Sequence, residues 1–157
     1  MSGSATRFER VGLLAGALAI AAPFAMVAGC GGEGVPVEAD VSAGTFAGAP
    51  LLQITSTGQH YSFAVRTSPQ PPQRGLGSAQ LTITDANGVP ASDLVLAVTP
   101  WMPDMGHGSS VKPTVTAKGG GVYLVEDLYF FMPGRWQLRT HLEGGSPDDA
   151  APEFQIE

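Results

Sequence analysis

Short stretches of alternating apolar and polar side chains run through the chain from about Leu51 to its end. Side chains two residues apart point to the same face of a β-strand, so this period is typical of strands that bury one face. The clearest stretches are 60–67, 78–85 and 93–99, and the pattern recurs around Val115, Tyr123, Trp136 and Phe154, with 51–55 opening the series. We therefore expect about seven or eight strands.

The segments between these stretches favour turns. Asn87-Gly88, the three glycines 119–121 and Pro133-Gly134 supply residues that tolerate positive φ or fix the chain direction. No window shows a sustained helical period with caps. The sequence predicts an all-β fold for residues 51–157, an immunoglobulin-like antiparallel β-sandwich without the usual cysteine pair. A small barrel is the alternative.

The first 29 residues have the pattern of a secretory signal peptide. Arg7 and Arg10 precede an uncharged run that extends to Gly29, and small residues stand before Cys30. The ending Val-Ala-Gly-Cys resembles the lipobox of bacterial lipoproteins, in which the cysteine is lipidated and becomes the first residue of the mature chain. We expect Cys30 to anchor the protein to a membrane outside the cytoplasm. An uncleaved membrane helix is the alternative for the uncharged run.

Residues 30–50 are rich in Gly, Ala, Val and Ser and show no periodic pattern, which predicts a flexible tether after the lipidated cysteine. Gly31, and not an aspartate, follows Cys30. In a Gram-negative organism this favours sorting to the outer membrane, on the side of the periplasm.

Charge and cysteine content exclude several classes of function. Removal of residues 1–29 lowers the 14 acidic residues by one and the 8 basic residues by two, so the net charge moves from −6 to about −7. This balance disfavours nucleic acid, which proteins bind through clustered Lys and Arg. The single cysteine, once lipidated, leaves no thiol for a disulfide, for thiol catalysis or for an iron-sulfur cluster.

The chain lacks the sequence patterns of an enzyme active site. His107-Gly108-Ser109-Ser110 has neither the strand-to-helix elbow nor the orienting group of a hydrolase. Glu126 and Asp127 are adjacent in an expected strand and would point to opposite faces. Three scattered histidines do not match the spacing of a zinc site. We therefore expect a non-catalytic protein.

Two glycine- and proline-rich segments hold the most distinctive chemistry. WMPDMGHG carries Met102, Met105 and His107, and FFMPG carries Met132. The first segment lies within a connection of about thirteen residues, 100–112, that has no strand periodicity. If each connection reverses the chain, both segments fall at one end of the sandwich. By the same count, His60 and His141 fall at the other end.

Three thioethers and one imidazole form a soft ligand set, which favours Cu(I) over Zn(II), Mg(II) or Ca(II). Asp104, the only carboxylate in this connection, is expected to form a turn or to face solvent. The alternative is that the methionines fill irregular gaps at the end of the core.

The motifs around these residues resemble those of the YtkA-like (FixH-related) domain family. WMPDMGHG, Gly121-Val122-Tyr123 and FMPGRWQL occur in the order of that family, and the resemblance covers about residues 81–142. It implies a small extracytoplasmic β-sandwich, often membrane-attached, in a family associated with copper handling and cytochrome oxidase assembly or with no assigned role. The family's Met and His positions map onto Met102, Met105, His107 and Met132, and its aromatic positions onto Tyr123 and Trp136, which we expect in the core.

Taken with the sequence patterns, the resemblance predicts a lipid-anchored β-sandwich that binds Cu(I) and holds it or passes it to a copper-accepting protein of the cell envelope. The alternative is a non-catalytic structural or interaction module. Its Met/Trp/Pro end would then be an apolar contact surface for another envelope protein.

Overall fold

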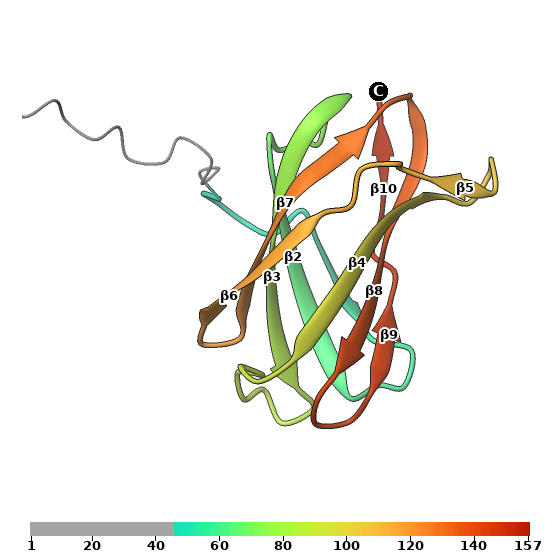
Figure 1. Ribbon diagram of the computed structural model, residues 1–157. Coiled ribbons are helices and arrows are strands. Elements are labelled where there is room, and N and C mark those ends of the chain that lie inside the picture. Colours follow the sequence, from blue (N-terminus) through green and yellow to red (C-terminus); the bar gives the residue numbers. More distant parts are fainter. Residues whose placement is uncertain (1–45) are drawn as a thin grey trace, which may run out of the picture. The chain divides into compact units, whose positions relative to one another are not determined.

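The computed structural model describes residues 46–157, and every regular element in this range is a β-strand (Figure 1). Ten strands follow one another: β1 (Leu52–Thr55), β2 (Tyr61–Ser68), β3 (Gly75–Asp85), β4 (Val95–Met102), β5 (His107–Gly108), β6 (Thr114–Gly119), β7 (Val122–Phe130), β8 (Gly134–Glu143), β9 (Asp148–Ala150) and β10 (Glu153–Ile156). The expected signal peptide, Cys30 and most of the expected tether lie outside the described residues. Residues 46–157 contain no helix of the length and apolarity that a membrane span requires.

The strands form two antiparallel sheets. The first has the order β1-β2-β3-β7-β6 and the second the order β10-β8-β4-β5, with β9 also paired to β8. In immunoglobulin terms, β2, β3, β7 and β6 take the places of strands A, B, E and D, and β4, β8 and β10 those of C, F and G. The expected antiparallel β-sandwich is confirmed.

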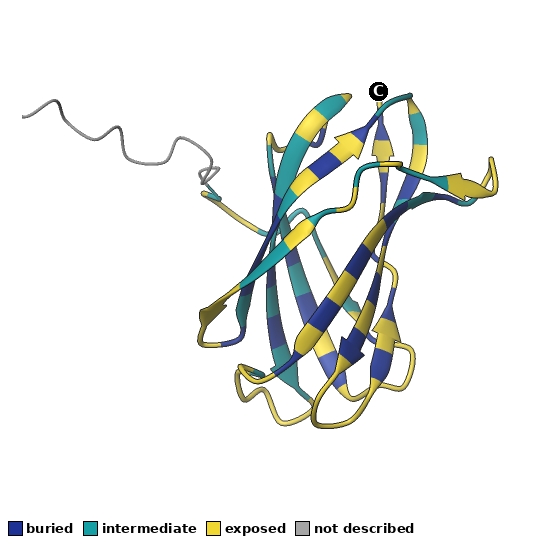
Figure 2. Cartoon of the chain, viewed as in Figure 1, coloured by how far each residue is buried: buried dark blue, intermediate teal, exposed yellow. Residues whose placement is uncertain are grey.

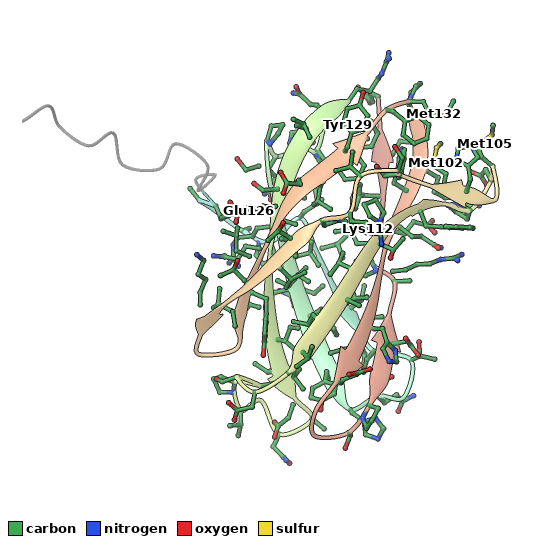
Figure 3. The ribbon with its side chains drawn as sticks, viewed as in Figure 1. Met102, Met105, Lys112, Glu126, Tyr129 and Met132 are labelled. Atoms are coloured by element: carbon green, nitrogen blue, oxygen red, sulfur yellow. The ribbon has the colours of Figure 1, made fainter. Side chains whose placement is uncertain are left out.

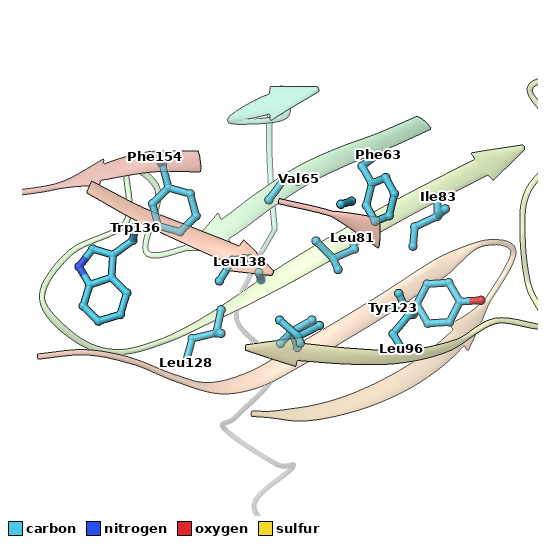
Figure 4. Close-up of a cluster of buried hydrophobic side chains, with 14 of the residues drawn as sticks. Phe63, Val65, Leu81, Ile83, Leu96, Tyr123, Leu128, Trp136, Leu138 and Phe154 are labelled. Atoms are coloured by element: carbon cyan, nitrogen blue, oxygen red, sulfur yellow. The ribbon is translucent and has the colours of Figure 1, made fainter. Parts of the chain in front are cut away.

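The core follows from the alternation along the strands. In β2 the buried side chains Tyr61, Phe63 and Val65 alternate with more exposed ones, and Figure 2 shows the same alternation on neighbouring strands. Both sheets contribute to the cluster in Figure 4. Tyr123 is 1% exposed and Trp136 is fully buried, so the expectation that both are core residues is confirmed.

The segment 100–112 differs from the prediction. β4 continues to Met102, and β5 pairs back on it as a tight hairpin, so much of the expected loop is strand. The alternation of apolar and polar residues is not visible in the sequence here. The outward-facing residue Trp101 is itself apolar and lies between the buried Pro100 and Met102. Proline is tolerated here because its missing N–H faces an edge of the sheet.

The number of strands also exceeds the seven or eight expected. β5 has two residues and β9 has three, which is too short for a period of two to be visible in the sequence. β9 begins with Asp148, a buried carboxylate that the sequence analysis did not single out.

Candidate metal centre

The two Met-bearing segments lie at the same end of the sandwich. β4 and β8 are antiparallel, with Trp101 opposite Gln137, so the end of β4 lies beside the start of β8. FFMPG leads directly into β8. Figure 3 shows Met102, Met105 and Met132 close together in this region. We call residues 102–107 and 131–135 the Met/His end.

The expected position of the other two histidines is also confirmed. His60 immediately precedes β2, and its Nδ1 lies 3.1 Å from a carboxylate oxygen of Asp148. His141 is opposite Ala97, near the start of β4. Both therefore lie at the end of the sandwich away from the Met/His end.

Met102 and His107 form a cross-strand pair. They are directly opposite each other in the β4–β5 hairpin. Opposite residues in an antiparallel pair project from the same face, with Cβ atoms about 4.5–5.5 Å apart. A thioether and an imidazole therefore leave the same face of the hairpin as neighbours.

Met102 also contacts the start of β8. Its side chain continues the inward row of β4 and is only 3% exposed. A Cβ built on Gly134 would lie 2.9 Å from Met102 Cε, so the absence of a side chain at Gly134 makes room for the methionine. The thioether of Met102 thus packs against the segment that carries Met132.

Aromatic contacts connect His107 to the same segment. The imidazole of His107 stacks on Phe131, with ring centroids 5.7 Å apart and an angle of 18° between the planes. Phe131 lies edge-on to Trp136 at 5.3 Å. The indole N–H of Trp136 donates to the carbonyl of Met132 at 3.1 Å. This chain of contacts links His107 to the backbone of Met132 through Phe131 and Trp136.

An ion pair fastens the hairpin turn to β8. Both carboxylate oxygens of Asp104 accept hydrogen bonds from the guanidinium of Arg135, which also lies 3.6 Å from Glu153. The hydrogen bond and charge of Asp104 raise the pKa of Arg135, and Glu153 adds to this. Asp104 is a turn residue, as expected, but sequence reasoning missed its partner because thirty residues separate them.

The four candidate residues differ in exposure. Met102 is buried, Met132 is half-buried, and His107 is exposed. Met105 occupies the hairpin turn, where its side chain is 55% exposed. The structure thus brings Met102, His107 and the Met132 segment together and leaves Met105 at the rim.

The arrangement offers soft donors at a solvent-accessible edge. The nearest carboxylate, Asp104, is occupied by Arg135. Within residues 46–157 no group of three or more His, Cys, Asp or Glu side chains could hold a metal ion. Thioethers and one imidazole are therefore the donor set that this part of the chain presents to a metal.

A family model described as YtkA-like matches residues 55–141, which is more than half of the chain. The matched range contains all four candidate residues. Comparisons with curated proteins and with solved structures gave no match.

Proposed function

The chain belongs to the YtkA-like family, and from this premise we propose that it is an extracytoplasmic lipoprotein that binds Cu(I) and holds it or passes it to a copper-accepting envelope protein. The ligands are the thioethers of Met102, Met105 and Met132 and the imidazole of His107, and Cys30 carries the lipid anchor. The observation that carries the proposal is the cross-strand pair Met102–His107, packed against the start of β8.

The donor chemistry suits Cu(I). Thioethers are soft, neutral ligands that select Cu(I) over harder ions, and imidazole binds it as well. The carboxylate of Asp104 is held by Arg135, which leaves few oxygen donors for harder ions. Exposure falls from 55% at Met105 to 3% at Met102, so an incoming ion meets Met105 first and Met102 lies deepest.

The test is a competitive Cu(I) titration under anaerobic, reducing conditions. Residues 31–157 compete with a chromophoric chelator, and a Met102/Met105/Met132→Leu variant is measured alongside. We expect one tight equivalent in the wild type and its loss in the variant, with thermal unfolding as the check that the variant folds. A wild-type domain that takes no Cu(I) from even a weak chelator would contradict the proposal.

A contact surface is the second candidate, and exposed apolar side chains favour it. Leu76 is 70% exposed and Tyr129 is 36% exposed, and the two are paired across β3 and β7. Tyr129 lies 6.4 Å from Phe131, which stacks on His107. The row from Leu76 to His107 would suit a partner protein with an apolar surface.

Two variants separate the candidates. Met105→Leu keeps the volume and the apolar character of the side chain but removes the sulfur, so we expect Cu(I) affinity to fall while an apolar contact changes by less than ~1.5 kcal/mol. Leu76→Ala is the matched control, because it removes apolar surface without removing a donor. Unchanged Cu(I) affinity in Met105→Leu would remove Met105 from the ligand set.

A further inference from the structure

β4 is paired along its full length on one side only. Residues Val95–Trp101 face β8, whereas on the other side only Trp101 and Met102 have partners, in the short strand β5. After β5 the chain leaves this sheet and crosses to β6 in the other one. The lower part of β4 is therefore an open edge, which Figure 1 shows beneath the crossover.

The backbone groups on this edge can be identified from the hydrogen bonds at its upper end. The N–H of Ser109 donates to the carbonyl of Pro100, so Pro100 faces the edge. Alternate residues of an antiparallel strand direct their N–H and C=O groups to the same side. Leu96 and Val98 therefore direct theirs to the edge, and Ala97 and Thr99 direct theirs to β8.

The opposite side of the sheet gives the same assignment. The N–H of Leu138 donates to the carbonyl of Pro152, so even-numbered residues of β8 face away from β4. The backbone N–H and C=O groups of His141 and the other odd-numbered residues of β8 then point toward β4. They lie opposite Ala97 and the other odd-numbered residues of β4. Among residues 46–157, no hydrogen bond reaches the N–H or C=O of Leu96 or Val98 from the open side.

A groove of ≈ 480 Å³ runs along this edge. Its floor holds the apolar side chains of Leu96 and Val98, both less than 10% exposed. The crossover after β5 forms the opposite wall. The lining residues are Leu96, Ala97, Val98, Thr99, Pro100, Ser109, Ser110, Val111, Lys112, Pro113 and Val115.

We propose that this groove binds an extended segment of a partner protein, which joins the sheet as a strand beside β4. The unpaired N–H and C=O groups of Leu96 and Val98 supply the main-chain hydrogen bonds, and the apolar floor receives alternate side chains of the segment. The open edge from Val95 to Thr99 is about 16 Å long at ~3.3 Å per residue, enough for a segment of about five residues.

The wall favours an extended segment over a second copy of the domain. A second sandwich would need clear space beside β4 to bring its own sheet edge alongside. Residues 109–113 line the groove together with β4, so a second sandwich would have to fit its sheet edge between them. A single extended chain fits this geometry.

Charge selects the kind of segment. Lys112 is the only charged residue that lines the groove, and Figure 3 shows it beside the upper part of β4. A segment with alternating apolar residues and a carboxylate near one end matches the apolar floor and this ammonium group. This inference goes beyond copper binding and stands whether or not the Met/His end holds the ion.

The test uses the full chain in mild detergent and fluorescein-labelled peptides in which valine and threonine alternate after an N-terminal aspartate. In an antiparallel pair, directly opposite residues project from the same face. Valines placed opposite Leu96 and Val98 therefore direct their side chains to the groove floor, and their backbone N–H groups donate to β4. N-methylation of the valines removes these donors, and N-methylation of the threonines is the control. We expect the first modification to weaken binding at least about tenfold by fluorescence anisotropy and the second to weaken it much less.

Lysine variants test the charge. Lys112→Glu should weaken binding of the acidic peptide by roughly two- to fivefold, as for an exposed ion pair, whereas Lys118→Glu, outside the groove, should not. Equal binding of the valine-methylated and unmethylated peptides, or no binding of any peptide at about 1 mM, a weak-affinity limit, would overturn the proposal.

Amide hydrogen exchange tests the edge directly. In the free protein the N–H groups of Leu96 and Val98 should exchange faster than those of Ala97 and Thr99, and the unmethylated peptide should slow them. Equal protection of all four groups in the free protein would show that the edge is already closed and would also overturn the proposal.

Discussion

Asp148 is a buried carboxylate at the end of the sandwich away from the methionines. Its side chain accepts hydrogen bonds from the backbone N–H groups of Gly58, His60 and Asp149, at 2.7, 3.3 and 2.8 Å. His60 adds a ring contact at 3.1 Å. These bonds hold the turn before β2 against β9, so one side chain joins the two sheets at this end.

The same bonds change the acidity of Asp148. Burial alone would raise the pKa of the carboxyl group, but the hydrogen bonds from the Ser56 hydroxyl and from the backbone of Gly58, Asp149 and His60 outweigh it, and the pKa lies well below its usual range. A group whose pKa is lowered on folding stabilises the fold above its unfolded pKa. That contribution is lost as the pH falls toward the folded pKa.

Asp148→Asn should therefore lower the free energy of unfolding at pH 7 by about 2–4 kcal/mol, because an amide leaves some of the N–H donors unpaired. Urea unfolding at a series of pH values should show the wild type losing stability below about pH 5, and the variant losing less over that range. Asp93→Asn, at an exposed position, is the control. A variant as stable as the wild type would show that these hydrogen bonds contribute little.

Gly134 is constrained both by its backbone conformation and by its contact with Met102. Its φ is 131°, outside the range that L side chains adopt readily, and a Cβ there would meet Met102 Cε at 2.9 Å. Gly134→Ala should destabilise the domain by about 1–3 kcal/mol and displace the side chain of Met102. Gly106→Ala tests backbone strain alone, because its φ is 70° and no atom lies within 4 Å of the added Cβ. If both variants lose the same stability and the same Cu(I) affinity, the contact with Met102 has no role.

At the scale of elements, the β4–β5 hairpin explains which features of the site could be read from the sequence. The expectation that each connection reverses the chain direction placed Met102 and Met132 at one end, and the structure agrees. The same reasoning missed the hairpin itself, because Pro100 and Trp101 obscure the period of two. A two-residue strand is formed by pairing with its neighbour and leaves no signal of its own in the sequence.

The contacts that fasten the hairpin were also outside the reach of sequence reasoning. Arg135 binds Asp104 across thirty residues, and the His107–Phe131 stack joins β5 to the loop before β8. Such contacts depend on the three-dimensional approach of segments whose side chains show no periodic pattern. Core residues such as Trp136 were easier to predict, because burial of one face of a strand leaves a two-residue period in the sequence.

The ion pair gives a prediction for the hairpin as a unit. Arg135→Gln should leave the midpoint of global unfolding nearly unchanged, since exposed ion pairs contribute little to stability. Local motion should increase instead, with faster amide exchange at Met105 and Gly106, whose N–H groups donate to the carbonyl of Met102. Arg74→Gln, at an exposed position outside the hairpin, should leave that exchange rate as it is. Unchanged exchange in Arg135→Gln would mean that the turn holds its shape without the ion pair.

At the scale of the whole molecule, the proposed role depends on where the domain is held. The chain is acidic, with a net charge of −6, so electrostatic attraction to an anionic membrane surface would not retain it. In the proposed function, a lipid on Cys30 is the attachment that would keep the Cu(I)-binding domain beside its partner.

Cys30→Ser tests the anchor. The variant should move from the membrane fraction to the soluble fraction and lose incorporation of labelled fatty acid, because a hydroxyl at this position does not form the thioether that attaches the lipid. Cu(I) affinity of the folded domain should not change, which provides the control. Continued membrane association of Cys30→Ser would favour the uncleaved membrane helix over a lipidated cysteine.

The crossover beside β4 affects the tendency of the domain to aggregate. An open strand edge is a template for edge-to-edge growth into fibrils, and natural proteins cover or shorten such edges. Here residues 109–113 line the groove beside β4, and in the proposed geometry they would leave room for a single extended chain but obstruct the sheet of another molecule. On this proposal, neighbouring copies of the domain would not pair through β4, and the edge would stay available to the partner segment.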